Sequence, residues 1–216
     1  MNQDLILKGL EVGPFMSNCF IVGSRRTKKG LIVDPGADAQ PILQEVHADG
    51  LDIQLIVITH GHVDHISAGA AVKQATGAQV AVHREDAPQM KGGGSSMASP
   101  FGMRFDPPPE PDRLLEDDDT IEVDGLSFRV LHTPGHSPGG ICLFGEGVVF
   151  TGDTLFNLSI GRFDLPGGDG RLLVNNILAK LMVLPEDTIV LPGHGPQSTI
   201  GHEKEWNPFL REDFLK

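Results

Sequence analysis

Four side chains that can ligate a metal ion fall within six consecutive residues. The segment THGHVDH, residues 59–65, contributes His60, His62, Asp64 and His65. Imidazole nitrogen and carboxylate oxygen suit zinc, iron or manganese, and the lack of cysteine in the segment disfavours a closed structural zinc site. Packing alone gives no reason to crowd three imidazoles and a carboxylate into so short a segment. The spacing therefore predicts a metal centre.

Three more potential ligands each follow an apolar run that is typical of a strand. FRVLHTPG precedes His136, VVFTG precedes Asp153, and TIVLPG precedes His194. Functional groups gather at strand ends because the sheet is rigid there while the loops can present side chains. Seven ligands exceed what one tetrahedral or five-coordinate ion can use. We therefore predict two divalent metal ions sharing one carboxylate, zinc before iron or manganese, with a bridging hydroxide as the nucleophile that attacks a carbonyl.

A competing motif overlaps one of these positions. GHSPG, residues 135–139, matches the G-x-S-x-G pattern of the nucleophile elbow in serine hydrolases. That elbow leads from a strand into a helix, whereas the run that follows here, GGICLF, is strand-like and Pro138 fits the helical turn poorly. We expect Ser137 to shape the turn that aims His136. The isolated histidines are expected to be surface or semi-buried groups without a metal, namely His47, His83, His132 and His202.

Short apolar runs bounded by Gly, Pro and Asp predict strands, and they outnumber the helix-like stretches. The predicted strands cover residues 5–12, 19–23, 30–36, 55–60, 79–83, 126–136, 140–153 and 188–194. The predicted helices cover residues 39–48, 66–76, 172–184 and about 202–214. Segment 91–112 is too rich in Gly and Pro for a regular element, which favours a mobile wall over the site, with a disordered insert as the alternative. No linker or repeat divides the chain, so residues 1–216 are expected to form one α/β domain.

The composition excludes several classes of function. The formal net charge is −12 and no continuous basic block occurs, so nucleic acid is a poor substrate. No stretch approaches the roughly 18 apolar residues of a spanning helix, and the N-terminus lacks a signal pattern. We therefore expect a cytoplasmic protein without a membrane partner. Cys19 and Cys142 each stand in an apolar run and are expected to be buried and reduced.

Four motifs in register resemble those of the metallo-β-lactamase superfamily. They are THGHVDH (59–65), HTPGHSPGG (132–140), FTGDTLF (150–156) and LPGHGP (191–196), and the resemblance extends over about residues 5–211. The stretch SIGRFDLPGGD (159–169) makes the chain most similar to the hydroxyacylglutathione hydrolase (glyoxalase II) branch. Full-length glyoxalase II enzymes add a helical C-terminal region that holds glutathione, and this chain stops soon after residues 206–209. It therefore resembles a short form of that branch.

The resemblance implies a four-layer αβ/βα sandwich of two mixed β-sheets with outer helices. By matching motif positions it implies a first metal on His60, His62 and His136, a second on Asp64, His65 and His194, and a bridging Asp153. Asp64 would also act in catalysis by orienting the hydroxide. Arg162 would bind substrate or pair with Asp164, and Asp34 resembles a residue in a turn or behind the ligands.

The resemblance leaves more than one activity open. The first is a thioesterase that acts on S-2-hydroxyacylglutathione or a related small-molecule thioester. The alternative is a persulfide dioxygenase, which is similar in sequence but uses one iron on two histidines and one aspartate, here His60, His136 and Asp153. A non-catalytic metal-binding module is a third interpretation, which the complete ligand set disfavours. The acyl group, the metal in the cell and the oligomeric state are not determined by the sequence.

Overall fold

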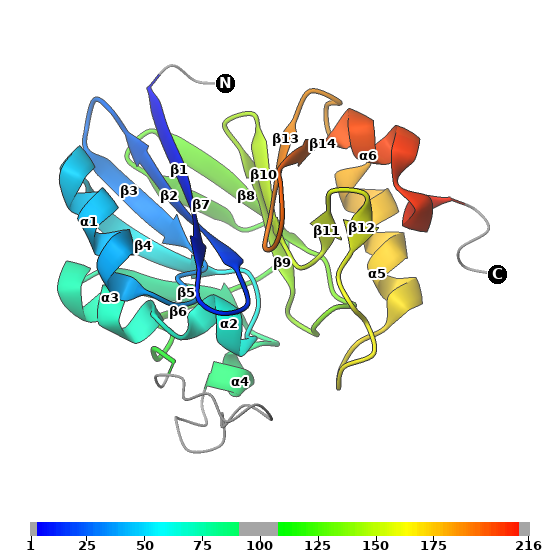
Figure 1. The fold of residues 1–216 in the computed structure, drawn as a ribbon, viewed down its shortest axis with the longest axis horizontal. Coiled ribbons are helices and arrows are strands. Elements are labelled where there is room, and N and C mark those ends of the chain that lie inside the picture. Colours follow the sequence, from blue (N-terminus) through cyan, green and yellow to red (C-terminus); the bar gives the residue numbers. More distant parts are fainter. Residues whose placement is uncertain (1–3, 91–107, 212–216) are drawn as a thin grey trace.

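The computed structural model describes residues 4–90 and 108–211. Most of its strands form two six-stranded sheets (Figure 1). The first sheet contains, in spatial order, β1 (Leu5–Val12), β2 (Ser17–Ser24), β3 (Lys29–Val33), β4 (Asp52–Ile58), β5 (Gln79–His83) and β6 (Arg113–Leu115). The second contains β14 (Ser198–Thr199), β13 (Ile189–Pro192), β10 (Val148–Gly152), β9 (Ile141–Gly145), β8 (Leu126–His132) and β7 (Thr120–Val123). A separate short hairpin consists of β11 (Leu155–Phe156) and β12 (Ser159–Ile160).

Both sheets are mixed. In the first, β3, β4, β5 and β6 run parallel while β1, β2 and β3 pair antiparallel. In the second, β10 and β13 are parallel and the other pairs are antiparallel. The parallel strands of each sheet therefore bring their carboxyl ends, and the loops that follow them, to a common edge.

Apolar side chains point to both faces of the central strands. In β2, Phe20 and Val22 join the core between the two sheets, whereas Cys19 and Ile21 join the core on the outer face. Side chains alternate with a period of two along a strand, so a strand covered on both faces is apolar throughout. This explains the uninterrupted apolar runs in the sequence. Cys19 and Cys142 are both buried and unpaired, as expected.

Helices cover the outer face of each sheet. They are α1 (Ala39–Asp49), α2 (Val63–Ile66), α3 (Gly69–Thr76), α4 (Ala87–Met90), α5 (Gly170–Asn176), a π-helical turn (Ile177–Leu181), α6 (Ile200–Trp206) and a 3₁₀ turn (Pro208–Leu210). Ile42 of α1 and Val72 of α3 are buried in the outer core of the first sheet, and Leu173 of α5 and Ile200 of α6 in that of the second. Figure 1 shows these helices on opposite sides of the two sheets. The predicted four-layer sandwich is therefore confirmed.

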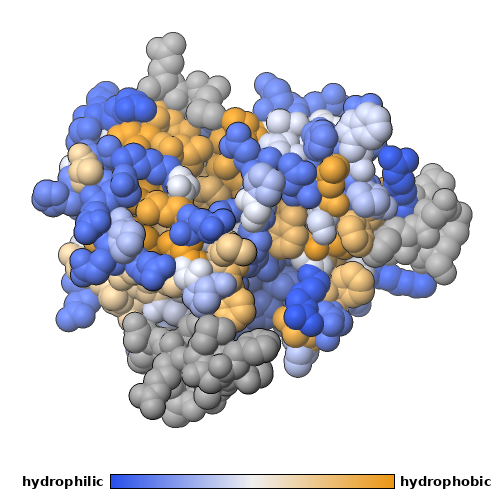
Figure 2. Space-filling model, in the orientation of Figure 1, coloured by the Kyte–Doolittle hydropathy of each residue, from blue (hydrophilic) through white to orange (hydrophobic). Residues whose placement is uncertain are grey.

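Polar side chains cover much of the outer surface. In Figure 2, hydrophilic residues lie over most of the described part of this face, and hydrophobic residues are visible between them over the strands of the first sheet. Within residues 4–90 and 108–211, none of the helices has the length and apolar character needed to cross a membrane.

The predicted strand 140–153 is in fact the hairpin of β9 and β10. Glu146 and Gly147 both adopt positive φ, 53° and 82°, which is typical of a tight hairpin turn. The sequence carries a signal for this turn, because Glu146 stands between two glycines, but the predicted strand 140–153 ran through it. The predicted strand 126–136 ends at His132, because the following residues form the loop that carries His136.

Several helix boundaries also differ from the prediction. The predicted helix 66–76 is divided into α2 and α3, and the helix predicted at 172–184 begins at Gly170 and passes into a π-helical turn. It begins there because the Asp169 side chain accepts a hydrogen bond from Leu172 N over 3.0 Å and so caps the first turn. The helix predicted at 202–214 is α6 followed by the 3₁₀ turn. The short strands β6, β7 and β14 were not predicted, and residues 91–107 of the proposed wall lie outside the described residues.

Candidate metal centre

Four strands end at the edge where the two sheets meet. The candidate ligands that follow them are His60 after β4, His136 after β8, Asp153 after β10 and His194 after β13. Main-chain hydrogen bonds join the sheets at this edge. Ile141 N donates to Thr59 O over 2.9 Å, and Asn18 N donates to Gly193 O over 2.7 Å. The loops that carry the ligands are therefore tied to each other as well as to their own strands.

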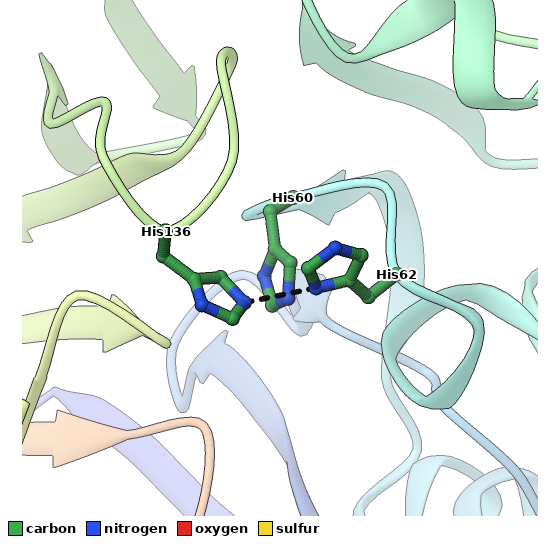
Figure 3. A group of neighbouring side chains, drawn as sticks. All are labelled: His60, His62 and His136. Atoms are coloured by element: carbon green, nitrogen blue, oxygen red, sulfur yellow. Dashed lines mark hydrogen bonds between the residues drawn. The ribbon is translucent and has the colours of Figure 1, made fainter. Parts of the chain in front are cut away.

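His60, His62 and His136 form a first group (Figure 3). One ligand atom from each lies within 4.8 Å of the other two. His136 Nε2 and His62 Nδ1 are 2.8 Å apart, and the His60 ring centroid lies 4.7 Å from that of His62 and 4.8 Å from that of His136. The buried His60 Nε2 has no hydrogen-bond partner within the described part of the chain. Three nitrogens thus converge on one point, as ligands of a cation do.

Hydrogen bonds on the far side of the rings determine which nitrogen faces this point. His136 Nδ1 lies 2.7 Å from the carbonyl oxygen of Arg162, which can only accept, so Nδ1 carries the proton and Nε2 keeps its lone pair. The Thr59 hydroxyl donates to Asp34 and therefore accepts from His60 Nδ1, which is 3.1 Å away. Both histidines consequently present the unprotonated Nε2 to the centre of the group.

Asp64, His65 and His194 form a second group, in which one ligand atom from each residue lies within 4.8 Å of the other two. His194 Nε2 lies 3.1 Å from Asp64 Oδ2 and 3.3 Å from His65 Nε2. His65 is fully buried, and its Nδ1 lies 3.0 Å from Asp34 Oδ2, so Nε2 faces the group. The group therefore offers two imidazole nitrogens and one carboxylate.

Asp153 lies between the two groups. Its Oδ2 is 3.5 Å from His136 Nε2 of the first group, and its Oδ1 is 3.4 Å from His65 Nε2 of the second. Asp153 Oδ1 is buried and makes no hydrogen bond to the described residues. A buried carboxylate oxygen and a buried imidazole nitrogen without partners fit a site built for cations. All seven residues named from the sequence are thus brought together, and their role as ligands stays a prediction.

The two groups differ in charge. Burial, together with the neighbouring imidazoles, holds the pKa of His60 well below its usual value and lowers the pKa of His62 to about 4. In the second group burial acts against the shift, yet Asp153 and Asp34 hold the pKa of His65 well above its usual value, and Asp64 raises the pKa of His194. Burial likewise opposes the shift of Asp64, but its hydrogen bonds with His194 and His65 keep its pKa far below the usual range.

Two buried aspartates hold the ligands from behind. Asp34, which follows β3, accepts hydrogen bonds from Thr59 N (2.7 Å), the Thr59 hydroxyl (2.6 Å) and His65 Nδ1 (3.0 Å). The sequence had indicated Asp34 as a turn residue or a residue behind the ligands. Asp86 was missed. It lies just past the end of β5 in HREDAP, so the strand-end signal that found the ligands was available for it too.

Two glycines allow the ligand loops to approach each other. A Cβ on Gly193 would lie 2.3 Å from Asp153 Oδ1 and 2.8 Å from His65 Cε1. A Cβ on Gly139 would lie 2.5 Å from Asp86 N. No side chain fits at either position without moving the site.

Other residues named from the sequence lie outside the two groups. The Arg162 guanidinium forms a bidentate pair with Asp164 at 2.8 and 2.9 Å, and both side chains are exposed. His83 and His132 stack on each other with ring centroids 3.8 Å apart, and His83 is buried. Ser137 is also buried, and its hydroxyl donates to Asp86 Oδ2 over 2.8 Å. This contact fits the expected role of Ser137 in shaping the loop, because its hydroxyl is engaged there.

Residues 12–194 match the family model described as the metallo-beta-lactamase superfamily. That span is most of the chain, so the protein belongs to this superfamily. A curated relative, "Hydroxyacylglutathione hydrolase GloC" of Haemophilus influenzae, is 36% identical over 213 residues, and the alignment covers 97% of this chain and 98% of the relative.

Solved structures of similar proteins share the fold over nearly the whole chain. The BLEG-1 B3 metallo-beta-lactamase has a TM-score of 0.89 at 36% identity, with 95% of this chain and 99% of that chain covered. TTHA1623 in a di-iron-bound form has a TM-score of 0.84 at 37% identity, with 94% of this chain and 100% of that chain covered. ETHE1 from Myxococcus xanthus has a TM-score of 0.80 at 28% identity, with 97% of this chain and 88% of that chain covered. The di-iron form of TTHA1623 and the paired groups described above support a dinuclear metal site.

Proposed function

We propose that this chain is a metal-dependent thioesterase that hydrolyses S-2-hydroxyacylglutathione or a related small-molecule thioester. The observation that carries the proposal is the pair of ligand groups on either side of Asp153, whose two oxygens face His136 and His65. The similarity to the curated hydroxyacylglutathione hydrolase GloC supports the choice of thioester. The chain would then be a short cytoplasmic member of the glyoxalase II-like branch, acting as a single domain because its ligands come from both sheets.

The proposed ligands of the first cation are His60, His62 and His136, those of the second are Asp64, His65 and His194, and Asp153 is shared. Zinc is the proposed metal, because nitrogen and oxygen donors without thiolate suit it, as they also suit iron and manganese. Two such cations supply activation of a water molecule near neutral pH and stabilisation of the oxyanion that forms at an attacked carbonyl.

Asp64 is the proposed catalytic residue. Its strongly lowered pKa keeps it an acceptor at neutral pH, so it can orient a water molecule by taking a hydrogen bond from it. The side chains of His194 and Asp64 keep 28% and 19% of their surface exposed, whereas the His65 side chain is fully buried. His62 of the first group is also only partly buried, so a thioester carbonyl can approach the site where His194, Asp64 and His62 reach the surface.

The test is hydrolysis of S-lactoylglutathione by purified protein whose metal content has been measured. We expect two metal ions per chain and a kcat/KM of at least about 10⁴ M⁻¹ s⁻¹. A thioester without glutathione and a cephalosporin should be assayed in parallel, because GloC and BLEG-1 are both similar to the chain. Asp64→Asn should lower kcat about 100-fold or more while the protein stays folded. Protein with two metal ions that leaves both thioesters intact would contradict the proposal.

A mononuclear iron persulfide dioxygenase acting on glutathione persulfide is the second candidate. It is supported by the similarity to ETHE1 and by the proximity of His136 Nε2 to Asp153 Oδ2, 3.5 Å apart, beside His60. Two histidines and one carboxylate on one side of an iron leave positions open for oxygen and substrate. One iron per chain and oxygen uptake with glutathione persulfide would favour this candidate. Two metal ions without oxygen uptake would exclude it.

A further inference from the structure

Asp86 is a fully buried carboxylate that touches both loops of the first ligand group. Its Oδ2 accepts hydrogen bonds from Gly61 N and from the Ser137 hydroxyl, both over 2.8 Å. Its Oδ1 accepts from Gly139 N over 2.6 Å and from the Gln89 side chain over 3.3 Å. Asp86 thus contacts atoms of two segments that are far apart in the sequence.

These donors stand next to the ligands in the chain. Gly61 lies between His60 and His62, and Ser137 follows His136 directly. The two loops come from different sheets, since His60 follows β4 of the first and His136 lies between β8 and β9 of the second. Figure 3 shows the imidazoles of these loops facing each other. One carboxylate therefore joins the two loops immediately beside the three nitrogens of the first group.

Burial removes this carboxylate from water, which is costly. The ion pairs among residues 4–90 and 108–211 do not include Asp86. A buried charge without a partner is stabilised only by the hydrogen bonds that it receives, and here two of them come from main-chain N–H groups. An apolar side chain in the same place would leave these donors without an acceptor, so the hydrogen bonds to the two loops are the feature that only an acceptor can supply.

We propose that Asp86 is the positioning residue of the first ligand group, which fixes the loop of His60 and His62 against the loop of His136 and so sets the affinity for one cation and not the other. Asp34 differs from Asp86 in that it supports both groups, His65 directly and His60 through the Thr59 hydroxyl. The proposal rests on the assignment of the two groups as cation sites, and not on the substrate.

Zn²⁺ binding by metal-free protein tests this in two backgrounds that each leave one group intact. His194→Ala keeps the first group, and His62→Ala keeps the second. In the His194→Ala background, adding Asp86→Asn should weaken Zn²⁺ binding about 10–100-fold in calorimetry, because the amide donates where the carboxylate accepted. In the His62→Ala background, the same change should alter binding less than about threefold.

Two matched variants control for the loss of a buried carboxylate. Asp34→Asn should weaken Zn²⁺ binding in both backgrounds, because Asp34 contacts His65 of the second group directly and His60 of the first through the Thr59 hydroxyl. Glu203→Gln removes a buried carboxylate that accepts from Leu158 N, Ser198 and Asn207, and it should leave both binding events unchanged. Equal losses in both backgrounds with Asp86→Asn, or no loss in the His194→Ala background, would overturn the proposal.

A second readout needs no metal. In the metal-free protein the amide protons of Gly61 and Gly139 should exchange with solvent at least about tenfold faster after Asp86→Asn, while that of Thr59, bonded to Asp34, should not change. If Asp86→Asn does not fold, Ser137→Ala removes one of the same hydrogen bonds and should weaken Zn²⁺ binding about threefold in the His194→Ala background; no weakening there would also overturn the proposal.

The outcomes separate this proposal from the proposed function. Wild-type protein that takes up no Zn²⁺ would remove the basis of both. Wild-type protein that binds two Zn²⁺ ions, with Asp86→Asn binding them equally well, would overturn only the role of Asp86.

Discussion

The two ligand groups lie beside each other but differ in electrostatic character. In the first group burial holds the pKa of His60 well below its usual value and lowers the pKa of His62 to about 4. In the second, carboxylates hold the pKa values of His65 and His194 above the usual value. A cation entering the first group meets free nitrogen lone pairs, whereas a cation entering the second must displace protons. Two groups with the same number of ligands can therefore differ in how readily they bind a cation.

The groups also differ in how they are held. Asp34 bonds directly to a ligand ring, through His65 Nδ1, and to both polar groups of Thr59. Asp86 bonds to loop atoms next to the ligands and to none of the rings themselves. Far-side hydrogen bonds thus orient rings in both groups, and Asp86 gives the first group an additional support that fixes two loops relative to each other. The following predictions test this difference.

Asp153→Asn should have the largest effect, because it acts on both groups. One oxygen becomes an amide nitrogen, which faces either His136 or His65 and cannot ligate a cation. We expect less than one metal ion per chain by elemental analysis and a loss of at least about 1,000-fold in kcat/KM for the thioester. Asp164→Asn, at an exposed aspartate, is the control. Retention of two ions by Asp153→Asn would contradict a shared ligand.

Asp34→Asn and Asp86→Asn should each destabilise the metal-free protein by about 1–3 kcal/mol, because each leaves buried donors without an acceptor. Asp34 accepts from Thr59 N and its hydroxyl, and Asp86 from Gly61 N and Gly139 N. Denaturant unfolding of metal-free variants measures this. An unchanged unfolding midpoint for either variant would show that the loops relax around the amide. That aspartate would then not hold its ligand loops as described.

The second group should lose its cation first as the pH falls. Since the pKa values of His65 and His194 are raised above the usual histidine value, protons compete for these nitrogens at a higher pH than for His62, whose pKa is lowered to about 4. Dialysis of the Zn²⁺-loaded protein between pH 8 and pH 5 should release one ion before the other. His62→Ala, which keeps the second group, should lose its ion at a higher pH than His194→Ala. If His194→Ala lost its ion at the higher pH, the assignment of the raised pKa values to the second group would be wrong.

Arg162→Ala should have the smallest effect. Its main-chain oxygen, which holds His136 Nδ1, is unchanged by the substitution, so the metal content should not change. If the exposed guanidinium binds an anionic substrate, KM for S-lactoylglutathione should rise about threefold while kcat stays the same. The thioester without glutathione serves as the control, because it lacks the anionic groups of glutathione. An unchanged KM for both substrates would leave Arg162 as a partner of Asp164 only.

The candidate ligands could be named from the sequence because their signals are local. THGHVDH is a cluster within one loop, and each of the distant residues His136, Asp153 and His194 follows an apolar run in its own segment. The short apolar runs likewise predicted strands and an α/β chain. The four-layer arrangement came from the resemblance of four motifs, and it is what the structure shows.

Tertiary structure decided what depends on contacts between distant segments. The turn at Glu146 and Gly147 had a signal in the sequence, since a charged residue stands between two glycines there, but the pairing of β9 with β10 is seen only in the folded chain. Which nitrogen of each histidine faces the cation follows from far-side partners such as the Arg162 carbonyl oxygen, 26 residues from His136. The sequence places Asp86 just after a strand end, but only the folded chain shows that it is buried between two ligand loops. The sequence determined the chemistry of the ligands, because that chemistry depends on residue type. The hydrogen bonds that hold the ligands depend on which loops meet in the folded chain, so only the tertiary structure decided them.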